Sequence, residues 1–271
     1  MGESINEAKQ KIKSLTNFED KVAIVTGSAI GLGRVTALQL AELGAKVVIV
    51  DRRAEEGPKT VEDIRSMGRE ATFVEAELKY KDDCERMVKE AVEAYGHIDI
   101  AVNNAGISGA PGKIIDREEE EWQKVLDNDV SSCLWSMKYE LRQMLAQGGG
   151  FEVGHAICNV ASTTGLVSYP ESSLYTASKH AVIGLTKAAA LEYIGDGIRV
   201  NVIAQAAMNT NGFQEFTAED PERQDKLQKY HPIGRISEPE EIASGIVYLC
   251  SPAASFCVGT ILTIDGGVTA A

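Results

Sequence analysis

The sequence predicts an α/β fold with a seven-stranded, doubly wound parallel sheet and helices on both of its faces. Short runs rich in β-branched residues alternate with longer segments of helical periodicity from Lys21 onward. Such alternation is typical of βαβ units with right-handed crossovers. The chain has 271 residues, of which 44% are hydrophobic, which is enough to bury one large core. We therefore expect a single domain over residues 21–271.

Seven segments are expected to be strands: Val22–Val25, Lys46–Val50, Ala71–Val74, Ile98–Val102, His155–Val160, Arg199–Ala204 and Thr260–Ile264. Helices are expected between them, after the first strand to about Leu43, over 54–67 and 80–95, and as one long stretch over about 117–147. The segment 205–230 has no strand pattern. A segment of that length without regular structure is typical of a lid or a substrate loop.

Residues 1–20 are predicted to form a helical arm that precedes the domain. Ile5, Ala8, Ile12 and Leu15 recur at helical spacing between polar residues. An isolated helix this short is marginal in water, so the apolar stripe must pack on something or the segment is disordered. We expect it to dock on a neighbouring subunit of a homo-oligomer, with docking on its own domain as the alternative.

The composition excludes several classes of partner. The net charge is −13 and the pI is near 4.9, so the surface repels phosphate backbones and anionic lipid, and neither nucleic acid nor membrane is an expected partner. The five cysteines form no C-x-x-C pair, which favours free thiols in a reducing compartment, and the four histidines have no metal-ligand spacing. No apolar run approaches the roughly 20 residues that span a bilayer. The N-terminal residues lack the basic-then-apolar pattern of a secretory leader. We therefore expect a cytoplasmic protein without a metal site.

The first strand runs into a glycine-rich turn, Thr26-Gly27-Ser28-Ala29-Ile30-Gly31-Leu32-Gly33. Glycines permit a tight turn and a close approach of the backbone to a pyrophosphate, and the helix start that follows offers free N–H groups. Because the turn lies between a strand and a helix, it predicts a Rossmann-type dinucleotide site. The candidate contacts are Gly27, Ser28, Ile30, Gly31 and Gly33.

A carboxylate ends the second strand, 24 residues after Gly27. Asp51 can accept hydrogen bonds from both ribose hydroxyls of NAD and would repel the 2′-phosphate of NADP. The competing signal is Arg52-Arg53, which could bind that phosphate. We give the carboxylate more weight and expect NAD(H). Other cofactor contacts are expected at Arg52 and at the ends of the third and fourth strands, namely at Glu77, Leu78, Asn104, Ala105 and Gly106.

The residues expected to perform the chemistry follow the fifth strand. Ser162 comes directly after it, Tyr175 lies 13 residues later and Lys179 four residues after that. The spacing of four puts Tyr175 and Lys179 on one face of a helix. A nearby ammonium favours tyrosinate and lowers a phenol pKa that is about 10 when unperturbed. Such a tyrosine can exchange a proton with an alcohol, while the serine hydroxyl hydrogen-bonds the substrate oxygen.

Together these residues resemble the short-chain dehydrogenase/reductase family in its single-domain form. The resemblance covers about residues 18–268 and includes the glycine turn, Asn103-Asn104-Ala105-Gly106, Ser162, Y-x-x-x-K, Ile198-Arg199-Val200-Asn201 and Asp265-Gly266-Gly267. It implies that Tyr175 is the catalytic acid and base, that Ser162 positions the carbonyl, and that Lys179 also binds the nicotinamide ribose. It further implies that Thr210 contacts the carboxamide. Members are mostly tetramers or dimers, so a tetramer is favoured.

Three positions depart from the family pattern. Asp129 stands where the family has an asparagine that supports a water chain to the lysine, so we count it as a catalytic residue whose charge opposes the effect of Lys179 on the tyrosine pKa. Gln205-Ala206 replaces Pro-Gly after the sixth strand, so the backbone over the nicotinamide is expected to differ. The loop around Gly148–Gly154 is a few residues longer than usual.

The expected substrate pocket is largely apolar and has no cluster of basic residues: it comprises Ser162, Thr163, Thr164, Leu166, Val167, Tyr169, Met208, Phe213 and Phe216. This lining favours a small apolar alcohol or ketone that is cyclic or steroid-like, as in the hydroxysteroid and cyclic-ketone dehydrogenases of the family. A sugar-alcohol dehydrogenase and a 3-oxoacyl reductase are the alternatives within the family. A catalytically idle member that binds nucleotide as a sensor or scaffold is the alternative of another class.

Overall fold

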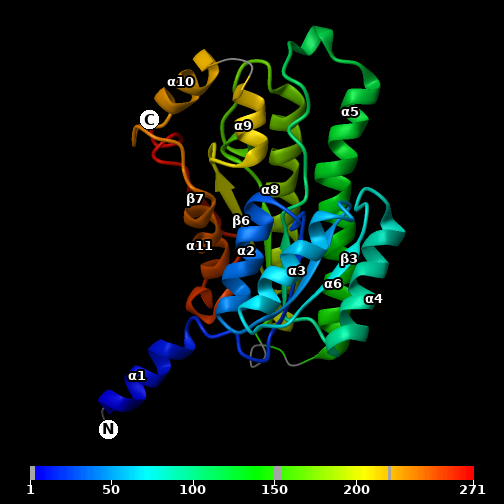
Figure 1. The fold of residues 1–271 in the computed structure, drawn as a ribbon, viewed down its shortest axis with the longest axis vertical. Helices are drawn as coiled ribbons and strands as arrows, with labels where there is room; N and C mark the ends of the chain where they lie inside the picture. Colours follow the sequence, from blue (N-terminus) through cyan, green and yellow to red (C-terminus); the bar gives the residue numbers. More distant parts are fainter. Residues whose placement is uncertain (1–3, 149, 151–153, 219–220) are drawn as a thin grey trace.

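The structure is a computed structural model that describes residues 4–148, 150, 154–218 and 221–271 (Figure 1). Its centre is a sheet of seven parallel strands in the order β3-β2-β1-β4-β5-β6-β7. The strands are β1 Val22–Thr26, β2 Lys46–Asp51, β3 Ala71–Glu75, β4 Ile100–Asn103, β5 Ala156–Val160, β6 Arg199–Gln205 and β7 Ile261–Ile264. All seven predicted strands are confirmed to within two residues at each end, and so is the fold class.

The chain reverses its direction of winding at β1, because β2 lies on one side of β1 and β4 on the other. The loops that follow β1 and β4 therefore leave the sheet in opposite directions. They open a crevice at its carboxyl edge, where ligands bind in open α/β sheets. The glycine turn and the Asn104 segment, which follow β1 and β4, both lie at this crevice.

Helices cover both faces of the sheet, as the sequence predicts (Figure 1). One face buries α2 Gly31–Glu42, α3 Glu56–Ser66 and α11 Pro239–Cys250 in a single apolar cluster. The other face packs α4 Lys81–Tyr95, α6 Ser132–Gln147 and α8 Ser173–Tyr193. Four of the strands are fully buried and β2 is buried except at Lys46, which agrees with their nearly continuous apolar sequences.

The long helix predicted over 117–147 is interrupted. It consists of α5 Glu119–Leu126, a π-helical turn Asp127–Ser131, and α6. A capping box between Glu118 and Glu121 starts α5. A π-turn adds one residue to a helix, and the helical periodicity of 3.6 does not reveal that insertion. The sequence pattern therefore predicts one continuous helix.

The prediction that 205–230 is irregular is wrong. The segment contains α9 Asn211–Ala218 and α10 Pro221–Lys229. Most of the described side chains of α10 are exposed and only Leu227 is half-buried, so α10 lacks the apolar stripe that predicts a helix. Its place above the carboxyl edge of the sheet agrees with the predicted lid (Figure 1).

The predicted arm helix is present as α1 Ile5–Ser14 and projects away from the sheet (Figure 1). Ile5 and Ile12 are 76% and 66% exposed, so these two side chains do not dock on their own domain. The arm is held near its end, where the N–H of Ala253 donates to the carbonyl of Leu15 at 3.2 Å and Phe18 enters the core. The side chain of Ala8 lies outside the described residues. Docking on a neighbouring subunit stays a prediction.

No helix in the described ranges is long and apolar enough to cross a membrane.

Candidate functional site

The glycine turn brings the backbone of β1 against the start of α2. A Cβ on Gly33 would lie 2.2 Å from the carbonyl oxygen of Gly27, so no larger residue fits there. Gly27 itself has a φ of +62°, which glycine adopts without strain. The first turn of α2 carries no side-chain cap, which leaves its N–H groups facing the crevice.

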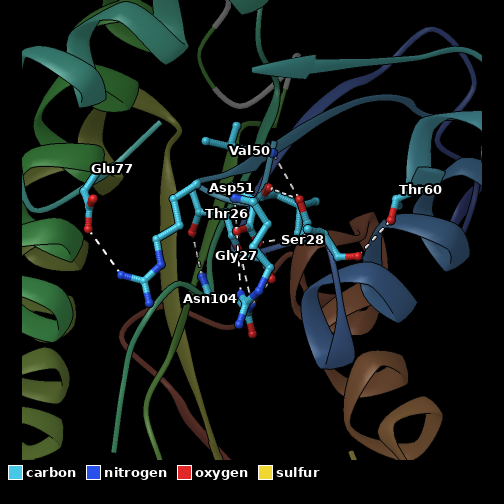
Figure 2. A network of polar contacts seen from close by, with 12 residues as sticks. Thr26, Gly27, Ser28, Val50, Asp51, Thr60, Glu77 and Asn104 are labelled. Atoms are coloured by element: carbon cyan, nitrogen blue, oxygen red, sulfur yellow. Dashed lines mark hydrogen bonds and ion pairs between the residues drawn. The ribbon is translucent and has the colours of Figure 1, made fainter. Parts of the chain in front are cut away.

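Asn104 fastens the loop after β4 to the glycine turn (Figure 2). Its side-chain amide donates to the carbonyl oxygens of Thr26 and Gly27, each at 3.0 Å. The hydroxyl of Thr26 accepts from the N–H groups of Asn104 and Ala105. These contacts hold the loop after β1 and the loop after β4 together at the bottom of the crevice.

Ser28 is a predicted cofactor contact, but its side chain makes hydrogen bonds within the protein. Its hydroxyl donates to the carbonyl of Val25 at 2.6 Å, accepts from the N–H of Val50 at 3.1 Å, and is fully buried (Figure 2). It joins the glycine turn to β1 and β2. A role for Ser28 in cofactor binding stays a prediction for its backbone alone.

Asp51 lies at one end of the crevice and is 5% exposed. Its carboxylate accepts from the N–H groups of Ala29 at 3.1 Å and Arg53 at 3.0 Å. The two arginines that compete with it both face carboxylates: Arg53 lies 3.7 Å from Asp51, and Arg52 donates to Glu77 at 3.2 Å. Leu78, Ala105 and Gly106 line the same end of the crevice, as predicted for cofactor contacts.

Tyr175 and Lys179 lie at the other end of the crevice, in a cavity also lined by Ile30, Gly31, Asn104, Met208 and Thr210. The Lys179 ammonium lies 5.3 Å from the centre of the Tyr175 ring. It also contacts Asp129 at 3.4 Å and the carbonyl of Val160 at 3.4 Å. Burial works against the charge on Lys179, but the Asp129 carboxylate and the Tyr175 hydroxyl outweigh it and raise the lysine pKa above its usual value. These two neighbours therefore favour the charged form of Lys179 beside the tyrosine.

Asp129 is fully buried on the π-turn and is confirmed as a neighbour of Lys179. One carboxylate oxygen accepts from the N–H of Ile107 at 2.7 Å, and the other accepts from the Ser178 hydroxyl at 2.8 Å. Gly106 leaves room for the pair, because a Cβ there would lie about 3 Å from both the aspartate oxygen and the lysine nitrogen. Asp129 thus partly neutralises the ammonium that supports the tyrosine.

We expect Asp129→Asn to move the pH profile of alcohol oxidation toward lower pH by about one unit, because the change removes a negative charge that disfavours tyrosinate. The amide oxygen can still accept from Ile107, so the fold should be kept. The measurement is kcat against pH for both proteins. Asp127→Asn is the matched control, since that carboxylate faces Gln123 and should leave the profile in place. Coincident profiles for wild type and Asp129→Asn would contradict this electrostatic role.

Ser162 begins a 3-10 turn over Thr163–Gly165 that packs on α8. Its hydroxyl accepts from the N–H of Thr164 at 3.2 Å, and Gly165 lies so close to the carbonyl of Lys179 that a Cβ would clash. The Ser162 hydroxyl proton is therefore not used by this bond and can be donated to a ligand.

The structure places the predicted substrate residues at several different points. Met208 lines the cavity beside Tyr175. Tyr169 packs edge-on against Tyr230, with ring centres 5.8 Å apart, so it links the loop after Ser162 to the end of α10. Leu166 packs partly on the core of the α8 face. Thr164 is buried, Phe213 is half-buried, and the side chain of Phe216 lies outside the described residues.

The crevice fits a nicotinamide dinucleotide. The glycine cradle and the open start of α2 suit a pyrophosphate, and Asp51 suits a ribose diol at one end. The proton-transferring Tyr175 lies at the other end, where the nicotinamide must meet its substrate. No cluster of three or more metal-ligating side chains is found in the described part of the chain.

Comparisons with known proteins agree with this geometry. A sequence profile described as enoyl-(acyl carrier protein) reductase matches residues 27–269. A cyclohexanol dehydrogenase of Acinetobacter sp. is 39% identical over 260 residues, which cover 96% of this chain and 99% of the relative. The chain belongs to the short-chain dehydrogenase/reductase family. A 3beta-hydroxysteroid dehydrogenase of Mediterraneibacter gnavus is 34% identical over 270 residues, or 93% of this chain and 96% of the relative.

A solved structure from Agrobacterium tumefaciens, determined with bound NADP, has a TM-score of 0.85 and 32% identity, over 95% of this chain and 99% of that one. The protein is thus a short-chain dehydrogenase/reductase that uses a nicotinamide cofactor and acts on CH–OH groups.

Sequence reasoning missed a buried carboxyl in this short-chain dehydrogenase/reductase. Glu140 on α6 is fully buried and accepts from the side-chain amide of Asn103, the last residue of β4, at 3.0 Å. Asn103 donates also to Asn159 on β5. Burial raises the Glu140 pKa to about 7, although the hydrogen bond from Asn103 acts to lower it. A charged residue within an apolar helix face was the available signal.

We expect Glu140→Gln to become more stable than wild type as the pH rises. The folded pKa lies above the usual 4.5, so the unfolded state loses the proton first and wild-type stability falls between about pH 4.5 and 7. Glutamine does not ionise, and a shift of that size corresponds to about 3 kcal/mol. Melting temperatures of the two proteins should therefore diverge from pH 5 to pH 8.

Glu85→Gln, on the exposed side of α4, is the control and should follow wild type. If Glu140→Gln shows the same pH dependence as wild type, Glu140 is not held protonated in the fold.

Proposed function

We propose that the protein is an NAD(H)-dependent dehydrogenase that interconverts an apolar cyclic secondary alcohol and its ketone. The observation that carries the proposal is the crevice itself. A buried carboxylate, Asp51, lies at one end, and Tyr175 lies at the other with the Lys179 ammonium 5.3 Å from the centre of its ring.

The side chains at the Tyr175 end of the crevice perform the proton transfer. A nicotinamide cofactor held in the crevice would supply the hydride acceptor or donor. In the oxidation direction the Tyr175 phenolate takes the hydroxyl proton of the alcohol, and the Ser162 hydroxyl donates a hydrogen bond to the oxygen as it becomes a carbonyl. The Lys179 ammonium stabilises the phenolate, and Asp129 holds the ammonium in place.

The substrate class rests on the lining and on the relatives. Met208 presents apolar surface beside Tyr175, and the two cations among the described residues that line this cavity, Lys179 and Arg53, both lie against carboxylates. Relatives named for cyclohexanol and for a 3beta-hydroxysteroid favour a cyclic alcohol. A sugar alcohol would leave this apolar surface without a partner, and an acyl group on an acidic carrier protein would meet a chain of net charge −13, so these alternatives are disfavoured.

We expect kcat/KM with NAD⁺ to exceed kcat/KM with NADP⁺ by at least about tenfold. A 2′-phosphate would lie against the buried Asp51 carboxylate, and a like-charge contact of about 1.4 kcal/mol already gives that factor. Asp51→Ala should narrow the gap, because it frees Arg53 from its ion pair.

Initial rates with both cofactors measure the preference, and Glu62→Ala, at an exposed carboxylate of α3, is the matched control. Equal or better efficiency with NADP⁺ would overturn the cofactor assignment and make Arg52 and Arg53 the phosphate ligands.

A further inference from the structure

Gln205 is the last residue of β6 and is only 7% exposed. Its side-chain oxygen is buried, and no group in the described part of the chain donates a hydrogen bond to it. Gln205 lines the same cavity as Tyr175, Lys179 and Thr210. The Gln205 side chain therefore lies at the catalytic end of the crevice and carries an acceptor that no described group uses.

The backbone cannot relieve this oxygen by moving away. Gln205 pairs with Ile264 of β7, and the N–H of Ala206 donates to the carbonyl of Ile264 at 3.4 Å. A buried acceptor without a donor costs about 1–3 kcal/mol. A ligand that brings an N–H or O–H group into the cavity would recover that energy.

The chemistry of the site narrows the choice of ligand group. Hydride transfer requires the pyridine ring of the cofactor to contact the substrate carbon, whose oxygen is held by Tyr175. The ring must therefore occupy this half of the crevice. Its carboxamide carries two N–H donors and one acceptor, which complement a glutamine amide. The hydroxyl proton of the alcohol is engaged by Tyr175, so the substrate offers no second donor.

We infer that the Gln205 side-chain amide binds the carboxamide of the nicotinamide ring and selects for it. The inference rests on the nicotinamide-dependent reaction proposed above and concerns a residue that the family pattern does not supply, since proline is usual at this position. Thr210 lines the same cavity and would share the carboxamide.

The test is calorimetric binding of three ligands to wild type and to Gln205→Met, which keeps the length of the side chain but has no amide. The ligands are NAD⁺, its 3-acetylpyridine analogue, which lacks the amide N–H donors, and ADP-ribose, which lacks the ring. Gln39→Met on α2 is the control, because that amide faces the carbonyl of Glu240 outside the crevice.

Gln205→Met should weaken NAD⁺ binding by roughly 5- to 30-fold. It should weaken binding of the acetylpyridine analogue much less and leave the affinity for ADP-ribose unchanged. The preference for NAD⁺ over the analogue should therefore be smaller in Gln205→Met than in wild type. Retained ADP-ribose binding shows that the variant is folded.

Two results would overturn the inference: an unchanged affinity of Gln205→Met for NAD⁺, or an equal loss for all three ligands. Wild type itself must bind NAD⁺ more tightly than the analogue, and equal binding there would also overturn it. Failure of the proposed function looks different, because wild type would then bind none of the three ligands or would oxidise no alcohol. If wild type proves to prefer the 2′-phosphorylated cofactor, the same comparison is made with NADP⁺ and its acetylpyridine analogue.

Discussion

Tyr175→Phe should lower kcat by about 10²- to 10⁴-fold, which is the contribution of a positioned acid and base. The variant loses only the phenolic oxygen, while the Lys179 ammonium and its contact with Asp129 remain. Affinity for NADH should therefore be largely retained. Steady-state rates and a fluorescence titration with NADH measure the two quantities separately.

Tyr193→Phe is the matched control, because it makes the same chemical change at the far end of α8. That variant should keep its activity. A Tyr175→Phe enzyme that turns over at the wild-type rate would refute the proton-transfer mechanism, whereas a variant that also fails to bind NADH would show a structural role.

Arg199→Met should destabilise the protein by about 3–5 kcal/mol, because it leaves several buried carbonyls without a donor at about 1–3 kcal/mol each. The Arg199 guanidinium is buried below β6 and donates to four backbone carbonyls at and beyond the end of α11: those of Leu249, Cys250, Ser251 and Ala254, at 2.8 to 3.5 Å. It satisfies the last carbonyls of a helix whose dipole favours a cation there.

In a chain of this size such a loss lowers the melting temperature by roughly 10 °C. Arg199→Lys keeps the charge with fewer donors, so its melting temperature should lie between those of wild type and Arg199→Met. Arg142→Met on the exposed side of α6 is the control and should change stability little. A melting temperature of Arg199→Met equal to that of wild type would show that the four carbonyls do not depend on the guanidinium.

Most of the fold could be predicted because strand and helix periodicity report directly on burial. The strands from β1 to β7 are apolar runs bounded by turns, and their ends lie where the sequence places them. The glycine turn, Asp51, Tyr175 and Lys179 could also be predicted, because each depends on a short spacing along one element. All four lie at one crevice, as the topology requires.

What could not be predicted depends on contacts between distant segments. The π-turn that aims Asp129 at Lys179 differs from an ordinary helix by one residue in register. Glu140 gains its raised pKa from burial by other elements, and Gln205 acquires an unused acceptor only because β7 fixes its backbone. The described side chains of α10 are mostly exposed, so this helix leaves no apolar stripe in the sequence.

The central claim is that the protein oxidises a cyclic secondary alcohol with NAD⁺. The most direct measurement is the absorbance of NADH at about 340 nm when wild type is mixed with NAD⁺ and, in turn, cyclohexanol, a 3β-hydroxysteroid and a sugar alcohol, with Tyr175→Phe in parallel. NADH should accumulate with the cyclic alcohols and not with the Tyr175→Phe enzyme. Wild-type protein that binds NADH but oxidises none of these alcohols would contradict the claim and favour a nucleotide sensor or scaffold.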